Sequence, residues 1–239
     1  MFAALTEELV TGPDAHDEFE LTLSVHPLAD TGKSGRYASQ AMIVTTAARR
    51  IIELSKDGAK VKTILIDAPE GQDPMVHPEF RDIAQNLREL TDKWFPKSKL
   101  TVVSPALHLD DPERRISLTA FHRPILLFEA GTQKTFAALT DQDPQRFKDV
   151  CTAIEQIDME RWILRACFVR GDVDNSTDTE LRYWLSKVET FKPAHIQITT
   201  LPKADTKRKI KPVTATRLNA IAEKIAKKTE REVEILEAK

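Results

Sequence analysis

The stretch EFELTLSVHPLADTGKSGRYASQAMIVTTAARRIIELSKDG, residues 18–58, holds the first strand and the first helix that the sequence predicts. Apolar and polar residues alternate through EFELTLSV, which is typical of a strand with one buried face. The segment 38–58 then has helical periodicity and reaches a stop signal at Gly58. The loop between them is polar, basic and long for such a junction.

The same alternation of strand and helix continues along the chain. Further strands are predicted at 61–69, 99–105, 123–132, 161–171 and 195–201, with helices between them and a last helix at 214–230. About six strand–helix pairs predict parallel strands joined by right-handed crossovers. Open doubly wound sheets and (β/α) barrels both fit this order, and in either case binding sites lie at the carboxyl ends of the strands.

Composition limits the class of protein. The 239 residues carry a formal net charge of −2 and are 41% hydrophobic, which suits a sizeable core and gives no global basic field. No apolar run approaches the roughly 20 residues of a membrane span. The acidic amino-terminal segment lacks a signal sequence, so we expect a cytoplasmic protein with a lead at 1–17 and one domain at 18–239.

One spacing in the first strand–helix loop is informative. Ser34, Ala38 and Ala41 stand at the positions of a Cys-x-x-x-Cys-x-x-Cys motif. Later segments fall in a matching order: EGQDPMVHPEFRDIAQNLREL at 70–90, FEAGTQKTFAAL at 128–139, ACFVRGDVDNSTDTELRYWL at 166–185, and PAHIQITTLPKADTKRKIKPVTATRLNAIAEKI at 193–225. In this order and spacing, the chain resembles the radical S-adenosylmethionine (SAM) superfamily over residues 18–236.

The resemblance implies an α/β fold, a partial (β/α)6 TIM-like barrel, with a [4Fe–4S] cluster and SAM. The cluster positions are Ser34, Ala38 and Ala41, where the ligating sulfurs are absent. Iron–sulfur clusters need thiolates, so we expect no cluster in this chain as written. The chain's two cysteines, Cys151 and Cys167, fall in a predicted helix and a predicted strand and are expected to act as small buried hydrophobes.

A second motif has also changed. The family's Gly-Gly-Glu-Pro run, under the amino acid end of SAM, reads Gly-Gln-Asp-Pro at 71–74, and Gln40 replaces the usual aromatic residue before the third cysteine. From the resemblance and the strand-end positions we assign eight residues to a ligand site: Tyr37, Gln40, Glu70, Gln72, Asp73, Glu129, Arg165 and Asn175.

Charged residues suggest two further hypotheses. Arg165 shares a strand face with Cys167, and Glu129 is its natural partner if that face is interior. Asn175 and Ser176 could contact a ribose or could serve as turn and helix-cap residues. Five cations lie in the segment 203–211, namely Lys203, Lys207, Arg208, Lys209 and Lys211. They predict either a phosphate or nucleic-acid contact or a solvated loop.

Three functions remain open. The first is a cluster-free binding or scaffold protein that could still take a nucleoside, SAM, an anionic ligand or a protein partner. The second is a variant of an active radical SAM enzyme, with a [4Fe–4S] cluster only if its parent has cysteines at 34, 38 and 41. The third is a non-radical enzyme that uses Asp73, Glu129 and Arg165 together.

Overall fold

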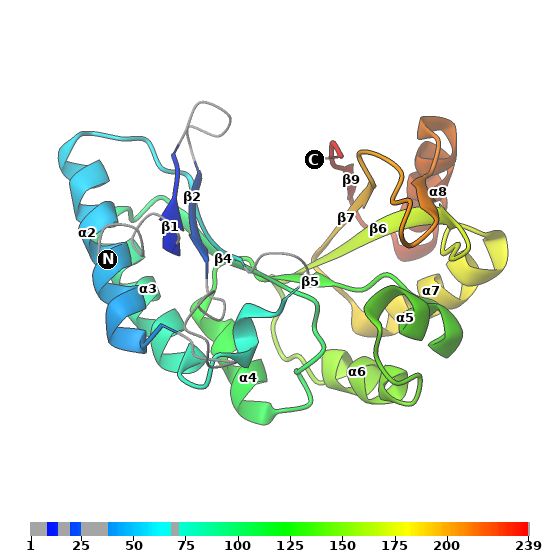
Figure 1. Ribbon diagram of the computed structural model, residues 1–239, viewed down its shortest axis with the longest axis horizontal. Helices are drawn as coiled ribbons and strands as arrows, with labels where there is room; N and C mark the ends of the chain where they lie inside the picture. The colour runs from blue at the N-terminus through cyan, green and yellow to red at the C-terminus, as the bar shows by residue number, and fades with distance from the viewer. Residues whose placement is uncertain (1–8, 14–19, 25–37, 68–71, 239) are drawn as a thin grey trace. The chain divides into compact units, whose positions relative to one another are not determined.

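A computed structural model describes residues 9–13, 20–24, 38–67 and 72–238 (Figure 1). By compactness the chain divides into a first unit, Met1–Ile125, and a second unit, Leu126–Lys239. The lead at 1–17 and the single domain at 18–239 stay predictions. Among the described residues, no helix combines the length and the apolar character that a membrane crossing needs.

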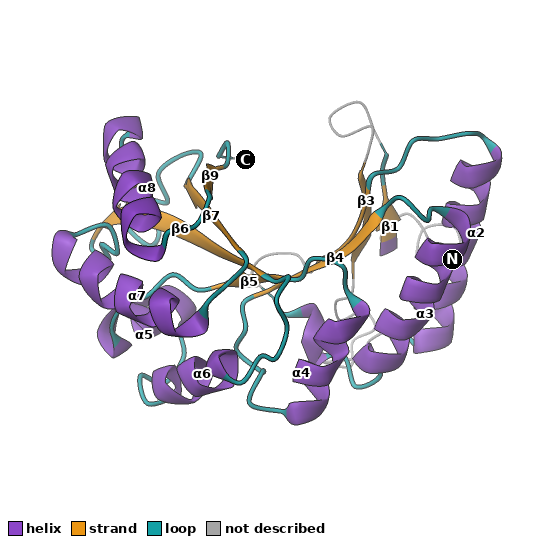
Figure 2. Cartoon of the chain, turned by 180° about the vertical axis from the view of Figure 1, so that it is seen from behind, coloured by secondary structure: helices purple, strands orange, loops and turns teal. Residues whose placement is uncertain are grey.

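The first unit pairs its strands in chain order. Strand β1 runs antiparallel to β2, and β2, β3 and β4 are parallel to one another. Helices lie on one face of these strands (Figure 2). The elements are β1 (Val10–Thr11), β2 (Glu20–Ser24), α2 (Gln40–Lys56), β3 (Thr63–Asp67), η2 (Pro74–Val76), α3 (Phe80–Trp94), β4 (Lys99–Ser104), α4 (Pro112–Ser117) and η3 (Leu118–Ala120).

The core of the first unit lies between its strands and its helices. Ile64 and Ile66 of β3 are fully buried, as is Ile83 of α3. The apolar positions predicted for α3 form its inner face, because residues three and four apart share one side of a helix. This packing holds the carboxyl ends of β3 and β4 beside the loop that carries Asp73.

The second unit is again built from parallel strands. The division between the units falls within β5, after Ile125. In the second unit β6 is parallel to β7, β7 is parallel to β9, and β8 is antiparallel to β6. The elements are β5 (Ile125–Leu127), α5 (Gln133–Thr140), α6 (Arg146–Glu155), β6 (Ile163–Gly171), α7 (Asp178–Phe191), β7 (His195–Thr200), β8 (Ile210–Pro212), α8 (Ala215–Thr229) and β9 (Val233–Ile235).

Aromatic side chains organise the core of the second unit. Trp184 of α7 is 1% exposed, and its indole N–H donates to the Phe128 carbonyl at 2.8 Å. Phe168 of β6 meets the Trp184 ring edge-on with centroids 5.6 Å apart. A buried tryptophan therefore satisfies its polar atom while it packs α7 against the strands.

The predicted alternation of strands and helices is confirmed, and several short elements were not predicted, among them β1, η2, α5 and β8. Helix α5 has eight residues with Thr132 as its N-cap, and β8 has three residues. Both are too short to give a clear period in the sequence.

Candidate functional site

The described part of the first strand–helix loop begins helix α2. Ser39 is the N-cap, and its side chain accepts a hydrogen bond from the Met42 amide at 3.3 Å. Ala38 precedes the cap with its side chain buried, whereas Ala41 is exposed in the first turn. Ser34 and Tyr37 lie outside the described residues.

His77 ties this loop to the segment after β3. Its Nε2 lies 2.9 Å from the Ala38 carbonyl, and its Nδ1 accepts the Glu79 amide at 3.0 Å. These two partners assign the tautomer with the proton on Nε2. The Gln40 amide in turn donates to Glu79 Oε2 at 3.3 Å. The backbone at Ala38 and Gln40 is therefore held by the 77–79 turn.

The residues present do not fit a [4Fe–4S] cluster. The methyl groups of Ala38 and Ala41 have no atom that can ligate iron. Burial raises the pKa of the Cys151 thiol to about 11 and that of Cys167 to about 12, so both are protonated near neutral pH. The described part of the chain holds no group of three or more His, Cys, Asp or Glu placed to bind a metal ion.

Asp73 forms a buried acidic site at the ends of β3 and β4. Its Oδ1 accepts the Met75 amide at 3.0 Å and the Ser104 hydroxyl at 2.9 Å. Its Oδ2 is buried and has no hydrogen-bond partner among the described residues. Burial raises the pKa of Asp73 above its usual value, although those two hydrogen bonds favour the charged form. Gln72 beside it is exposed, and Glu70 lies outside the described residues.

Glu129 lies just after the end of β5, and Asn175 lies in the turn that follows β6. Glu129 Oε1 accepts the Cys167 amide at 3.1 Å. The Asn175 amide group donates to the carbonyls of Glu129 and Cys167, both at 2.9 Å, and its oxygen accepts the Val169 amide at 2.7 Å. Asn175 is 1% exposed, and its side chain links the backbone of β6, at Cys167 and Val169, to the backbone at Glu129.

The carboxyl group of Glu129 loses most of its contact with water. This raises its pKa from 4.5 to about 7, although the Cys167 amide and the Arg208 cation favour the charged form. A glutamic acid near neutral pKa can hold or release a proton.

Arg165 of β6 is bonded to a glutamine on the neighbouring strand β7. Its Nε and Nη2 donate to Gln197 Oε1 at 3.0 and 2.8 Å. Gln197 donates onward to Glu234 Oε2 at 2.8 Å, and His195 Nε2 lies 3.3 Å from the same oxygen. The pairing register Arg165–Gln197–Glu234 puts these side chains on one face of β6, β7 and β9.

The hypothesis that joined Asp73, Glu129 and Arg165 stays untested. Asp73 belongs to the first unit, and the other two belong to the second. Within the second unit Arg165 donates two hydrogen bonds to Gln197, and Glu129 accepts one from the Cys167 amide.

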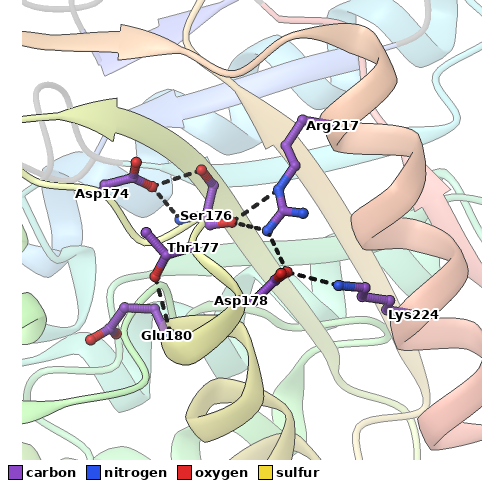
Figure 3. A network of polar contacts seen from close by, with 7 residues as sticks. All are labelled: Asp174, Ser176, Thr177, Asp178, Glu180, Arg217 and Lys224. Carbon is purple, nitrogen blue, oxygen red and sulfur yellow. Dashed lines mark hydrogen bonds and ion pairs between the residues drawn. The ribbon is translucent and has the colours of Figure 1, made fainter.

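A polar network fixes the turn between β6 and α7 (Figure 3). Arg217 of α8 donates to the Ser176 carbonyl and to Asp178 Oδ1, the latter at 3.0 Å, and Lys224 reaches the same carboxylate at 2.7 Å. These cations lower the pKa of Asp178. Ser176 lies here, and its hydroxyl donates to Asp174 Oδ1 at 2.7 Å within the turn. The ribose contact that we considered for Ser176 stays a prediction.

Comparison with known proteins supports the fold. No protein-family model and no curated protein matches the sequence. Among solved structures, TYW1 with a lysine-pyruvate adduct bound has a TM-score of 0.62 at 9% identity, over 88% of this chain and 74% of that one. A domain of the pyruvate-formate lyase-activating enzyme from Bacteroides vulgatus has a TM-score of 0.53 at 12% identity, over 70% and 96%.

A third similar structure is Streptococcus suis SuiB bound to S-adenosylmethionine. Its TM-score is 0.57 at 15% identity, and the match covers 80% of this chain and 43% of that one. These similar proteins are radical SAM enzymes. The chain therefore has the α/β fold of that class, a partial (β/α) barrel, as predicted.

Several residues of these sites were not found from the sequence. Ser104, the partner of Asp73, ends a predicted strand, so the strand-end rule could have included it. Gln197 alternates with the apolar residues Ile196 and Ile198 in the predicted strand HIQITTL. This alternation could have placed Gln197 on the polar face of the strand. His77 had no such signal, since its contact with Ala38 joins residues 39 positions apart.

Proposed function

We propose that this chain is a radical SAM-fold protein that works without a [4Fe–4S] cluster, as a binding or scaffold protein. The observation that carries the proposal is the chemistry of positions 38 and 41. Ala38 and Ala41 offer only methyl groups, and a cluster needs thiolate ligands. Replacing both thiolates removes the means of reducing and cleaving SAM.

The packing of Ala38 supports this reading. Its methyl group is 2% exposed and its carbonyl is bonded to His77, so this position serves to anchor helix α2. The two cysteines of the chain do not compensate, because burial keeps each as a neutral thiol.

Anaerobic reconstitution with iron and sulfide tests the proposal. We expect the purified chain to retain no stoichiometric iron and no cluster absorption. The matched control is the Cys151→Ser/Cys167→Ser variant, which should contain the same trace of iron as the unaltered chain. Stoichiometric iron and sulfide in the unaltered chain, with cluster signals in electron paramagnetic resonance after reduction, would overturn the proposal.

The ligand that we propose is SAM or a related compound with a positively charged amino group. Asp73 supports it, because one buried carboxylate oxygen lacks a partner while the other is held by Met75 and Ser104. An unpaired buried acceptor is costly, and an ammonium group that donates to it removes that cost. The resemblance puts the same position under the amino acid end of SAM.

The Asp73→Asn variant tests this ligand by calorimetric titration. Asparagine can keep both bonds at Oδ1 but presents an N–H group in place of Oδ2. We expect SAM affinity to fall about 10- to 100-fold, the size of one hydrogen bond to a charged group. Affinity for 5′-deoxyadenosine, which has no amino acid part, should stay unchanged.

The Asp82→Asn variant, in an exposed first turn of α3, is the control and should bind SAM as the unaltered chain does. If neither SAM nor 5′-deoxyadenosine binds the unaltered chain, the ligand proposal fails and only the scaffold role remains. Equal losses for both compounds would mean that Asp73 does not select the amino group.

We also propose that the protein acts in the cytoplasm. Both of its cysteines are free thiols, which fits a reducing compartment. A protein partner remains part of the scaffold proposal.

A further inference from the structure

The basic segment 203–211 forms a defined turn. The amides of Asp205 and Ile210 each donate to the carbonyl of the other, at 2.9 and 3.1 Å. The Asp205 carboxylate accepts the amides of Lys207 and Arg208 at 2.9 and 3.1 Å. The one acid of the segment thus holds the turn, and its cations project from that turn as exposed side chains.

Strand β8 adds a cation from a distant part of the chain. Its antiparallel pairing with β6 sets Arg170 directly opposite Lys211. Ile210, next to Lys211, is 4% exposed, and both basic side chains are exposed. Like charges directly opposite on neighbouring strands are destabilising, so this pair weakens the ribbon unless an anion lies between them.

The surrounding acids offset only part of this charge. Lys209 Nζ lies 3.8 Å from Asp172 Oδ2. Arg208 contacts the end of α5, where it donates to the Ala138 and Leu139 carbonyls at 3.0 and 2.7 Å. Within the described part of the chain, no ion pair joins an acid to Lys207 or Lys211. Arg170 Nε donates to the Pro212 carbonyl at 3.0 Å, but unlike Arg208 it uses no Nη atom in a hydrogen bond within the described part of the chain. We name Arg170, Lys207, Lys209 and Lys211 the β8 cation cluster.

We propose that the β8 cation cluster binds the phosphodiester backbone of a single-stranded nucleic acid. Lys207 and Lys209 lie in the turn and Lys211 follows in β8 opposite Arg170, so the turn and the pairing of β8 with β6 present these exposed cations at one end of β6. In Figure 1 the orange segment after β7 lies beside the end of β6, as the pairing of β8 with β6 requires.

The cluster fits a nucleic acid better than an acidic protein. Protein interfaces need an apolar centre, and the one large apolar side chain of the segment, Ile210, is already buried. Residues 203–212 contain no aromatic side chain for base stacking, so binding by the backbone alone predicts little sequence preference. The inference does not rest on the function proposed above, because it concerns a different surface and a different ligand.

Fluorescence anisotropy with labelled 20-nucleotide oligo(U) and oligo(dT) tests the proposal on the full chain. Four phosphate contacts predict that affinity falls about 50-fold between 50 and 200 mM salt. The Lys207→Gln/Lys209→Gln/Lys211→Gln variant leaves one such contact, so its affinity should fall only about 3-fold over the same range.

The matched control removes equal charge elsewhere in the second unit: Lys134→Gln/Lys148→Gln/Lys227→Gln, three exposed lysines. It should keep the salt dependence of the unaltered chain, and circular dichroism should show both variants folded. Equal weakening in both variants would overturn the proposal, as would a lack of oligonucleotide binding at 50 mM salt. A poly-glutamate peptide that binds the cluster as tightly as the oligonucleotides would also overturn it, in favour of an acidic protein.

Discussion

At the scale of single residues, Glu129 has the most unusual environment in the second unit. Its carboxyl group has little water around it, and it accepts a hydrogen bond from the Cys167 amide. The pKa rises from 4.5 to about 7, which means that folding favours the protonated acid. Between these two values the folded chain binds more protons than the unfolded chain, so stability falls as pH rises through this window.

The Glu129→Gln variant should remove this pH dependence. Glutamine stays neutral and its oxygen can still accept the Cys167 amide. We expect the unaltered chain to lose on the order of 1–3 kcal/mol relative to the variant between pH 5 and pH 8. Urea unfolding across this range measures the difference, and the exposed Glu160→Gln should behave as the unaltered chain. An unchanged slope in Glu129→Gln would show that its carboxyl group is ordinary.

At the scale of elements, helix α7 is held close to the loop between β5 and α5. Glu180 accepts hydrogen bonds from the Gly131 amide at 3.2 Å and from the Thr132 hydroxyl at 2.7 Å. A Cβ atom at Gly131 would lie 2.4 Å from the Glu180 carbonyl oxygen and 2.8 Å from the Trp184 nitrogen. The helix backbone therefore approaches this loop closely only because residue 131 has no side chain.

Substituting Gly131 by alanine should separate α7 from the loop. We expect Gly131→Ala to cost about 3 kcal/mol, at the upper end of overpacking substitutions, because rigid backbone atoms must move. Gly58→Ala is the matched control: its φ is +74°, but nothing lies within 4 Å of the added carbon, so only a conformational cost of about 1 kcal/mol applies. Urea denaturation compares the two, and a smaller loss for Gly131→Ala would contradict the close approach.

At the scale of the whole molecule, the fold is that of radical SAM enzymes, whereas positions 38 and 41 carry alanine. The first unit holds a buried acid at Asp73, and Ala38 and Ala41 stand where the resemblance implies cluster cysteines. The packing of strands and helices that forms this fold does not require cluster ligands at these positions. The net charge of −2 likewise conceals the β8 cation cluster, since screening makes charge a local property at physiological salt.

The sequence by itself determined the alternation of strands and helices, the α/β class and the lack of thiolates at positions 38 and 41. These follow from local periodicity and from residue identity, neither of which needs a third dimension. The sequence also located the basic segment 203–211, but it did not predict the turn within it. A run of charged residues has the same composition whether it is a solvated loop or a turn held by hydrogen bonds.

Only the tertiary structure decided which side chains meet. The His77 contact with Ala38, the Ser104 contact with Asp73, and the choice of Gln197 as partner of Arg165 all join residues at least 31 positions apart. The pairing of β8 with β6, which brings Arg170 beside Lys211, is of the same kind. Such contacts depend on strand register and on how helices pack, and no local pattern in the sequence encodes either one.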